Sequence, residues 1–163
     1  MFQIKLLILL LINLILFSCT NQNKLSSNYK FSVDYIEGGY DGLIVSNLIK
    51  AHLKSYNLLD KKSKLKIEAN FAHNDSIFIT NIDNTSDRQK VLSNISIKIY
   101  DQIDKCYVYF FNEKVSQFFI FAPSEKFISN EKAIKKIKYE NSEIILRRFI
   151  NDILYEELSC IEL

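Results

Sequence analysis

Glycine, proline and tryptophan are scarce in this sequence: its 163 residues include three glycines, one proline and no tryptophan. Nucleotide sites and acyl-transfer sites are commonly built on glycine-rich turns. The sequence has no P-loop, no dinucleotide-binding glycine motif and no Gly-x-Ser-x-Gly elbow. We therefore expect a protein that is not an enzyme and carries no cofactor.

A cluster of metal ligands is also missing. The histidines, His52 and His73, stand apart from other ligand types, and neither Cys106 nor Cys160 has the CxxC spacing of a metal or redox site. We expect surface or turn positions for both histidines, and no metal. The two cysteines could pair in an oxidising compartment. Sequence does not establish that they are close, and two unpaired cysteines are the favoured interpretation.

An excess of either charge is absent as well, since 21 Lys and Arg residues face 19 Asp and Glu residues. Nucleic-acid-binding domains are normally basic, so this balance argues against a nucleic-acid partner. Lys, Asn, Ile, Phe and Tyr are abundant, which is typical of an AT-rich genome. That bias reduces the weight of any single lysine as a functional signal.

The first residues have the organisation of a signal peptide. Met1 to Lys5 carry one positive charge, and Leu6 to Phe17 form an apolar run that only Asn13 interrupts. As a helix, this run would cover roughly 18 Å at about 1.5 Å per residue. Because a spanning helix needs about 20 apolar residues, the run is too short to remain as an anchor.

Leu16-Phe17-Ser18-Cys19 resembles the lipobox of bacterial lipoproteins. The resemblance implies that a lipid is attached to the Cys19 sulfur and that residues 1–18 are removed. Thr20, rather than Asp, follows the cysteine, which favours the outer membrane. The alternative is an ordinary signal peptide with an incidental cysteine.

The lipidated residues 19–28 are polar and read as a tether, which reaches roughly 30 Å when fully extended. The expected folded domain is 29–154, followed by a C-terminal tail, 155–163.

The folded domain is expected to begin with a strand and a helix. Residues alternate from Tyr29 to Ile36, which predicts a strand, and Gly38-Gly39 then breaks the chain. Asp41 is a plausible N-cap for a helix that runs to about Lys54.

A second strand is expected at Leu65 to Phe71. His73-Asn74-Asp75 is predicted to turn the chain or form a bulge before Ile77 to Thr80. A polar connection, 81–88, follows.

The alternation from Val91 to Ile99 predicts a third strand, and Gln102 to Asp104 turns it. Lys105 to Phe121 follows as one long strand or two halves, with Asn112-Glu113 as the expected interruption. Pro123 ends it, because proline suits strand termini.

Ser129 or Asn130 can cap a last helix, whose apolar face continues to about Leu154. The order β-α-β-β-β-α predicts an α+β fold, a two-layer sandwich of a small mixed sheet with two helices packed on one face.

This layout resembles the LPS-assembly (LptE-like) lipoprotein family. Locally, Thr85 to Arg88 precedes the alternating strand Val91 to Tyr100, and Lys114 to Phe119 runs into the loop before the last helix. The resemblance covers roughly Tyr29 to Leu154. It implies a protein that plugs a large outer-membrane β-barrel translocon, helps the barrel assemble and contacts lipopolysaccharide. The polar lumen of a large barrel can be plugged.

Arg88 matches a basic position of this family, and its guanidinium can hold a phosphate in bidentate fashion. Lys132, Lys135 and Lys136 share one helix face and are candidates for a phosphate-binding patch. These four residues are the predicted contacts with lipopolysaccharide or the barrel. The alternatives are a solvated loop arginine and an ordinary hydrated helix face.

The strand after residue 105 is apolar on both sides, which suggests helices on one side and a partner on the other. The alternative is a cover made by the chain's own tether or loops. One face is expected to carry large rings and the other mixed apolar groups; the two sets are Tyr107, Tyr109 and Phe111, and Cys106, Val108 and Phe110.

The leading hypothesis is therefore a lipid-anchored outer-membrane protein of lipopolysaccharide assembly, with its domain on the periplasmic side or within the barrel lumen. An auxiliary periplasmic lipoprotein of an ABC-type lipid transport system is the alternative. A periplasmic hydrolase without a recognisable motif is a third.

Overall fold

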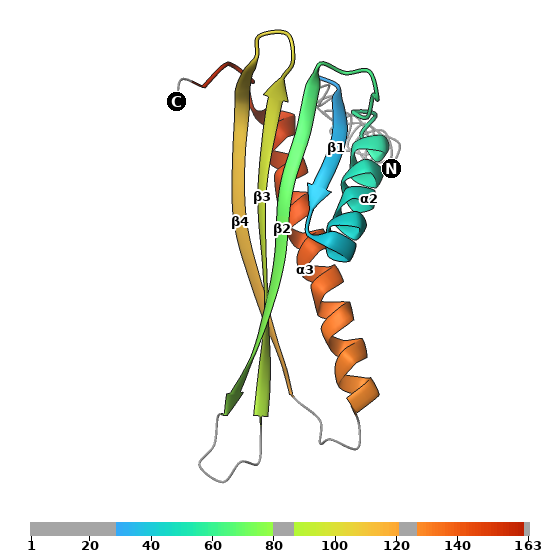
Figure 1. Ribbon diagram of the computed structural model, residues 1–163, viewed down its shortest axis with the longest axis vertical. Helices are drawn as coiled ribbons and strands as arrows, with labels where there is room; N and C mark the ends of the chain where they lie inside the picture. The colour runs from blue at the N-terminus through green and yellow to red at the C-terminus, as the bar shows by residue number, and fades with distance from the viewer. Residues whose placement is uncertain (1–28, 80–86, 121–126, 162–163) are drawn as a thin grey trace, which may run out of the picture.

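The computed structural model describes residues 29–79, 87–120 and 127–161. The predicted signal peptide, the lipobox with Cys19, the tether 19–28 and the strand end at Pro123 lie outside these residues. The predicted α+β order β-α-β-β-β-α is confirmed (Figure 1). The elements are β1 (Phe31–Glu37), α2 (Gly39–Ser55), β2 (Leu65–Ile79), β3 (Asp87–Asp101), β4 (Cys106–Ile120) and α3 (Phe127–Tyr155).

The four strands form one mixed sheet in the order β1-β2-β3-β4. β1 runs parallel to β2, whereas β2, β3 and β4 are antiparallel neighbours. The three antiparallel strands each have 15 residues, and β1 has seven. β1 therefore extends along only part of β2, from Leu65 to Asn70. The opposite end of the sheet consists of the three long strands alone (Figure 1).

Two predicted breaks in the strands are wrong. The segment from His73 to Asp75 continues β2 and pairs in regular register with Val91 to Ser93. The pair Asn112-Glu113 continues β4, because Asn112 is exposed on one face while Glu113 contacts Arg148 of α3 on the other. Polar residues thus fit into a continuous strand when each has solvent or a partner on its own side.

The predicted N-cap of the first helix is also wrong. Helix α2 begins at Gly39, with Gly38 as the N-cap at φ +130° and Asp41 in the first turn. A Cβ atom at Gly38 would lie 2.6 Å from the carbonyl oxygen of Phe71. Glycine is required there because this φ lies outside the range that most side chains adopt. The expected end near Lys54 is close to the observed Ser55.

Helix α3 begins at Phe127, before Ser129 and Asn130, so the predicted cap is wrong. It continues to Tyr155, close to the expected Leu154. Within the described residues, neither helix is long and apolar enough to cross a membrane.

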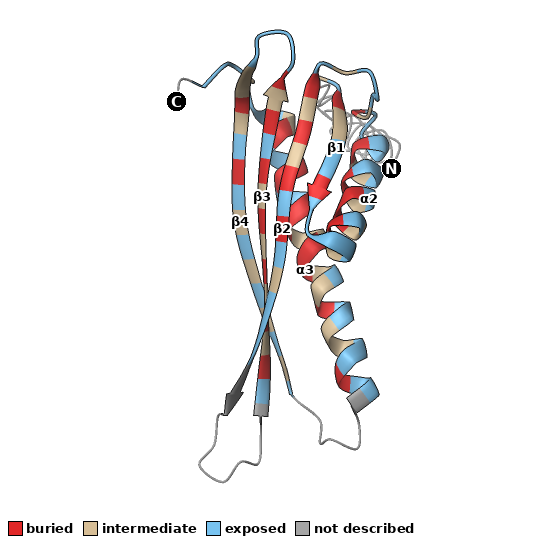
Figure 2. Ribbon diagram, viewed as in Figure 1, coloured by how far each residue is buried: buried red, intermediate tan, exposed pale blue. Residues whose placement is uncertain are grey.

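The apolar core lies between the sheet and both helices, at the end of the molecule that contains β1 (Figure 2). Fully burying a Leu, Ile or Phe side chain contributes about 1.5–3 kcal/mol. The largest fully buried side chains come from every element except β4: Phe31, Ile49, Leu53, Ile67, Ile95, Ile97, Ile99, Ile145, Leu146, Phe149, Ile150 and Ile153.

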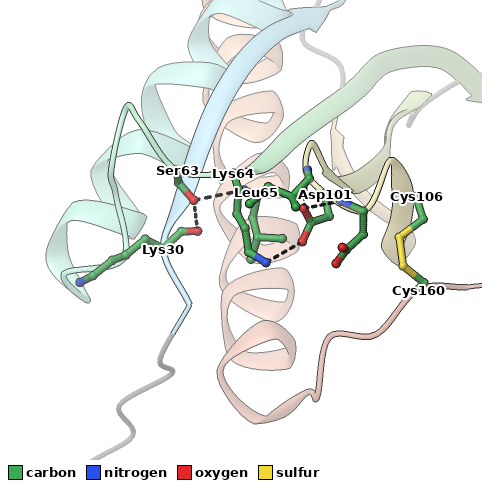
Figure 3. Close-up of polar contacts among 9 residues, drawn as sticks. Lys30, Ser63, Lys64, Leu65, Asp101, Cys106 and Cys160 are labelled. Atoms are coloured by element: carbon green, nitrogen blue, oxygen red, sulfur yellow. Dashed lines mark hydrogen bonds and ion pairs between the residues drawn. A yellow bond between two sulfur atoms is a disulfide. The ribbon is translucent and has the colours of Figure 1, made fainter.

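Cys106 and Cys160 form a disulfide, so the expectation of two unpaired cysteines is wrong (Figure 3). Their Cα atoms are 5.6 Å apart, within the usual range for a disulfide. The chain after α3 turns back to the start of β4, and the Ile161 N–H donates to the Tyr107 carbonyl at 2.9 Å. The tail is thereby attached to the sheet covalently and through its backbone.

The same end of the sheet is held by polar contacts around Asp101, which is almost fully buried (Figure 3). Its carboxylate accepts the N–H groups of Ile103 and Asp104 at 2.8 and 3.3 Å and pairs with Lys64 at 3.0 Å. Burial raises the pKa of Asp101, but these three partners outweigh it and hold the pKa below its ordinary value. The predicted turn at Gln102 to Asp104 is confirmed.

Candidate functional site

Both helices pack on one face of the sheet, and no described element covers the opposite face (Figures 1 and 2). We call this opposite face the open face. Its residues alternate along the strands with the buried ones. Near β1 it is mainly polar, and its central residues are Lys66, Glu68, Asn70, Asn94, Ser96 and Lys98.

A bulge in β4 decides which rings reach the open face. Tyr109 pairs with Ile99 and Tyr107 pairs with Tyr100, so Val108 is an extra residue with no partner in β3. Tyr107 therefore lies beside Tyr100 and Phe110, with ring centroids 5.3 and 5.4 Å away.

Tyr109 and Phe111 lie on the helix face instead. Their ring centroids are 6.2 and 5.6 Å from that of Phe149 in α3. The prediction that Tyr107, Tyr109 and Phe111 share one face is wrong, because simple alternation does not reveal an extra residue.

Lysines lie next to the exposed rings of the open face. The Lys98 Nζ atom is 5.4 Å from the Tyr107 ring centroid and 5.6 Å from that of Phe110. The Lys90 Nζ atom is 5.7 Å from the Phe118 ring centroid. Phe110 is 40% exposed and Phe118 is 55% exposed. Exposed rings with cations beside them are typical of a protein interface.

A trough of about 660 Å³ hollows the open face between β1 and the long strands. Asp34 pairs with Lys66 at 2.6 Å, and this hydrogen bond lowers the pKa of Asp34. The Tyr107 hydroxyl donates to Glu68 at 3.4 Å, and the negative charge of Glu68 raises the pKa of Tyr107. The buried Oδ1 atom of Asn94 has no hydrogen-bond partner among the described residues. The trough is thus a polar surface that still has hydrogen-bonding capacity.

A second hollow, of about 440 Å³, lies on the helix side. We call it the cleft. Lysines and tyrosines form much of its lining, which combines positive charge with apolar ring surface. Its lining residues are Tyr40, Asp41, Ile44, His73, Lys135, Lys138, Tyr139 and Ser142.

His73 is a half-buried residue of β2 that lines the cleft, so the expected turn position is wrong. Burial lowers its pKa from 6.5 to about 4, and the positive charge of Lys138 acts in the same direction. The nearby carboxylates of Asp41 and Asp75 oppose this shift without reversing it. The imidazole is therefore neutral at pH 7.

Behind His73 a polar layer connects the sheet to α3. The His73 Nδ1 atom lies 2.7 Å from the Ser93 hydroxyl, and Asn141 donates to the same hydroxyl at 3.0 Å. Asn141 also donates to the Val91 carbonyl at 3.2 Å and accepts from Gln117 at 2.9 Å. Ser93 and Asn141 are fully buried, so these hydrogen bonds satisfy groups that have no access to water.

The predicted contact residues do not form a single site. Arg88 is exposed and lies on the open face, in the same row of β3 as Lys90 and Lys98. Lys132, Lys135 and Lys136 lie on the exposed side of α3, across the sheet. Only Lys135 lines the cleft, together with the unpredicted Lys138, whereas Lys136 pairs with Glu140 at 3.7 Å.

His52 contacts Glu143 at 3.2 Å and so connects α2 to α3. Within the described residues, no group of three or more His, Cys, Asp or Glu side chains is placed to hold a metal ion.

The polar layer was not predicted, although the sequence contains a signal for it. Ser93 interrupts the buried row of β3 between Val91 and Ile95, and Asn141 lies between the buried Ile137 and Ile145 of α3. Polar residues at core positions in two elements are candidates for pairing across the core.

No family model matches the chain, and no curated protein matches it in sequence. Solved structures do share its fold. The minor lipoprotein of Acinetobacter baumannii has a TM-score of 0.60 and 9% identity, over 82% of this chain and 96% of that chain.

Rare lipoprotein B of Shewanella oneidensis has a TM-score of 0.56 and 10% identity, covering 76% of this chain and 95% of that chain. A candidate lipoprotein of Caulobacter crescentus has a TM-score of 0.55 and 13% identity, covering 80% and 90%. The chain therefore shares its fold with proteins named as bacterial lipoproteins. Membership of the LPS-assembly family stays a prediction.

Proposed function

We propose that this protein is a non-enzymatic outer-membrane lipoprotein of lipopolysaccharide assembly. Its domain docks through the open face against a large β-barrel translocon, plugs the barrel, helps it assemble and contacts lipopolysaccharide. The lipid on Cys19 holds it at the membrane, since two or more acyl chains anchor stably.

The observation that carries the proposal is the contrast between the two faces of the sheet. Two helices bury one face, whereas the open face presents Phe110 and Phe118 beside Lys98 and Lys90. Rings of this kind provide contact area, and the lysines can pair with acidic groups of a polar barrel wall.

Contact with lipopolysaccharide is assigned to basic groups on the helix side. Lys135 and Lys138 border the cleft beside Tyr40 and Tyr139. Phosphates carry negative charge that ammonium groups can pair with, and the rings offer an apolar surface to an acyl chain. Arg88, on the other side of the sheet, is better placed to touch the barrel than to share this site.

Purification from detergent-solubilised membranes tests the docking face. The full-length lipoprotein is expected to recover a large barrel protein, and the double variant Phe110→Ser, Phe118→Ser is expected to lose it. The matched control is Leu43→Ser, Tyr155→Ser, which removes two exposed apolar side chains from the helices. Recovery with the periplasmic subunit of an ABC transporter instead would reject the translocon and favour the alternative.

Depletion tests the role in assembly. Surface lipopolysaccharide and the folded barrel are expected to disappear together when the lipoprotein is depleted. If cells that lack the lipoprotein keep both their surface lipopolysaccharide and the folded barrel, the proposed function is contradicted.

A further inference from the structure

One end of the molecule combines the start of the folded domain with two connections. The chain enters β1 there, the loop 56–64 joins α2 to β2, and the turn 102–105 joins β3 to β4 (Figure 1). We call the surface formed by residues 29–30, 56–64 and 102–105 the anchor end. Because the tether leads directly into this end, the lipid proposed on Cys19 lies within roughly 30 Å of it.

The tether limits how the domain can stand on a membrane. Helix α3 has 29 residues and is about 43 Å long, and it runs from the opposite end of the molecule toward the anchor end (Figure 1). If the domain stood with the opposite end on the membrane, Tyr29 would be farther from the membrane than the tether can reach. Of the two ends, the anchor end is therefore the one that the lipid holds near the headgroups.

The anchor end is basic. Its segments contain two aspartates, Asp60 and Asp104, and five exposed lysines: Lys30, Lys61, Lys62, Lys64 and Lys105. Lys64 pairs with the buried Asp101 at 3.0 Å, so the other four lysines give this surface its net positive charge. The acidic residues of the tail, at positions 156 and 157, lie toward the β4 side, where the tail is attached.

Backbone hydrogen bonds hold the loop 56–64 in place between β1 and the turn (Figure 3). The Asp60 N–H donates to the Phe31 carbonyl at 2.9 Å, and the Gln102 N–H donates to the Lys64 carbonyl at 3.0 Å. The Asp60 carboxylate accepts the N–H of Lys62 at 2.9 Å. A surface that is already ordered loses less conformational entropy when it docks.

The anchor end also exposes two apolar side chains close to its lysines. Tyr56, at the start of the loop, is 50% exposed, and Ile103, in the turn, is 68% exposed. Lysines attract anionic headgroups, and rings and aliphatic groups beside them enter the boundary between headgroups and acyl chains. The combination of charge and apolar side chains suits a lipid surface.

We propose that the anchor end docks on anionic phospholipid headgroups of the membrane that holds the lipid of Cys19. Lys61 and Lys62 face the headgroups, and Ile103 reaches the boundary with the acyl chains. The domain then stands upright, and its open face is directed along the membrane toward a barrel in the same bilayer. This inference rests on one part of the proposed function, the lipid anchor.

A single tryptophan can report this docking, because the chain has no tryptophan of its own. Ile103→Trp places the probe at the anchor end, and Ile128→Trp places it at the start of α3, at the opposite end. The two positions are matched, since they are 68% and 69% exposed. Each full mature lipoprotein is inserted through its lipid into phosphatidylcholine vesicles with or without an equal share of phosphatidylglycerol. Both kinds of vesicle contain a lipid with a quencher in its headgroup.

The lipid holds the protein on both kinds of vesicle, so a difference between them reports docking of the domain. The Ile103→Trp emission should be about twofold lower on the phosphatidylglycerol vesicles than on phosphatidylcholine alone. About 1 M salt should remove the difference, because it shortens the screening length to about 3 Å. The Ile128→Trp emission should be the same on both vesicles.

Replacement of the lysines tests the role of charge. In the Ile103→Trp background, Lys61→Gln with Lys62→Gln should abolish the additional quenching on phosphatidylglycerol vesicles. The matched control is Lys132→Gln with Lys136→Gln, which removes two exposed lysines near the opposite end and should keep the quenching.

The possible outcomes separate this inference from the proposed function. Equal Ile103→Trp emission on the two kinds of vesicle overturns the docking and leaves the open face intact as the barrel contact. Quenching that persists in Lys61→Gln with Lys62→Gln, together with loss of barrel recovery by that variant, makes the barrel the partner of these lysines and also overturns the docking. A mature lipoprotein that sediments with neither kind of vesicle has no lipid anchor, which overturns both.

Discussion

The two ends of the molecule are built in different ways. At the end that contains β1, both helices cover an apolar core, and the disulfide and the Asp101 contacts tie the strand ends together. Toward the other end, α3 alone faces the three long strands across the polar layer of Ser93 and Asn141 (Figure 2). The comparison indicates that the first end supplies most of the stability. The second end carries Phe118 and Ile120, whose side chains are exposed on the open face.

Removal of a large side chain from the apolar end is expected to have the largest effect. Phe149→Ala should lower the free energy of unfolding by about 3–5 kcal/mol, because the ring is fully buried against Tyr109 and Phe111. Urea unfolding measures this loss. Tyr155→Ala, at an exposed site on the same helix, should change stability by less than about 0.5 kcal/mol. Equal losses at the two positions would contradict the assignment of the core.

Opening the disulfide is expected to have the next largest effect. The bond closes a loop between residues 54 positions apart, so Cys106→Ser with Cys160→Ser should cost about 2–4 kcal/mol. Thermal unfolding with and without a reductant measures it. The double variant should not respond to the reductant, whereas the unaltered protein should. If the reductant does not change the thermal unfolding of the unaltered protein, the disulfide is not accessible to it.

The polar layer should respond less strongly. Asn141→Ala removes the side-chain partner of Gln117 and one hydrogen bond each to the Val91 carbonyl and the Ser93 hydroxyl, and should cost about 1–3 kcal/mol. Asn151→Ala is the matched control, because Asn151 is exposed on the same helix. A variant as stable as the unaltered protein would show that water replaces the amide and that this end is already hydrated.

The smallest expected effect is a pH dependence that originates at His73. Above pH 6.5 the imidazole is neutral in both the folded and the unfolded chain. Between pH 6.5 and about 4, the unfolded chain binds a proton that the folded protein does not. The free energy of unfolding therefore decreases as the pH is lowered through this range. Because the His73 side chain is partly exposed, solvent screening reduces the size of this pH dependence. His73→Gln should make the fall in this window shallower, as measured by urea unfolding at pH 7 and pH 4.5.

Much of the fold was predictable because alternation and helical periodicity report burial directly. The alternation from Val91 to Ile99 predicted the central strand, and the helical spacing of Ile145 and Phe149 predicted the buried face of α3. These patterns depend on local geometry alone, so they predicted the element order and the helix-covered face. The breaks expected at His73 and Asn112 were wrong because polar residues in a strand can have partners that lie far away in sequence.

The candidate site was less predictable, because it depends on contacts between distant elements. The bulge at Val108 changes which rings share a face, and only the pairing of β4 with β3 reveals it. The disulfide and the cleft likewise require the tertiary fold, which places Cys160 beside Cys106 and Lys138 near His73. Arg88 and the lysines of α3 were grouped by residue type, and the sheet separates them.

The disulfide also defines how the molecule carries mechanical load. Cys160 lies just beyond α3, and its covalent bond leads directly to the first residue of β4. A pull on the chain after residue 160 is therefore transmitted through sulfur to the sheet and bypasses the helix. With the bond intact, α3 is shielded from such tension; with the bond reduced, the same pull would peel the helix from the sheet, beginning at its last turn.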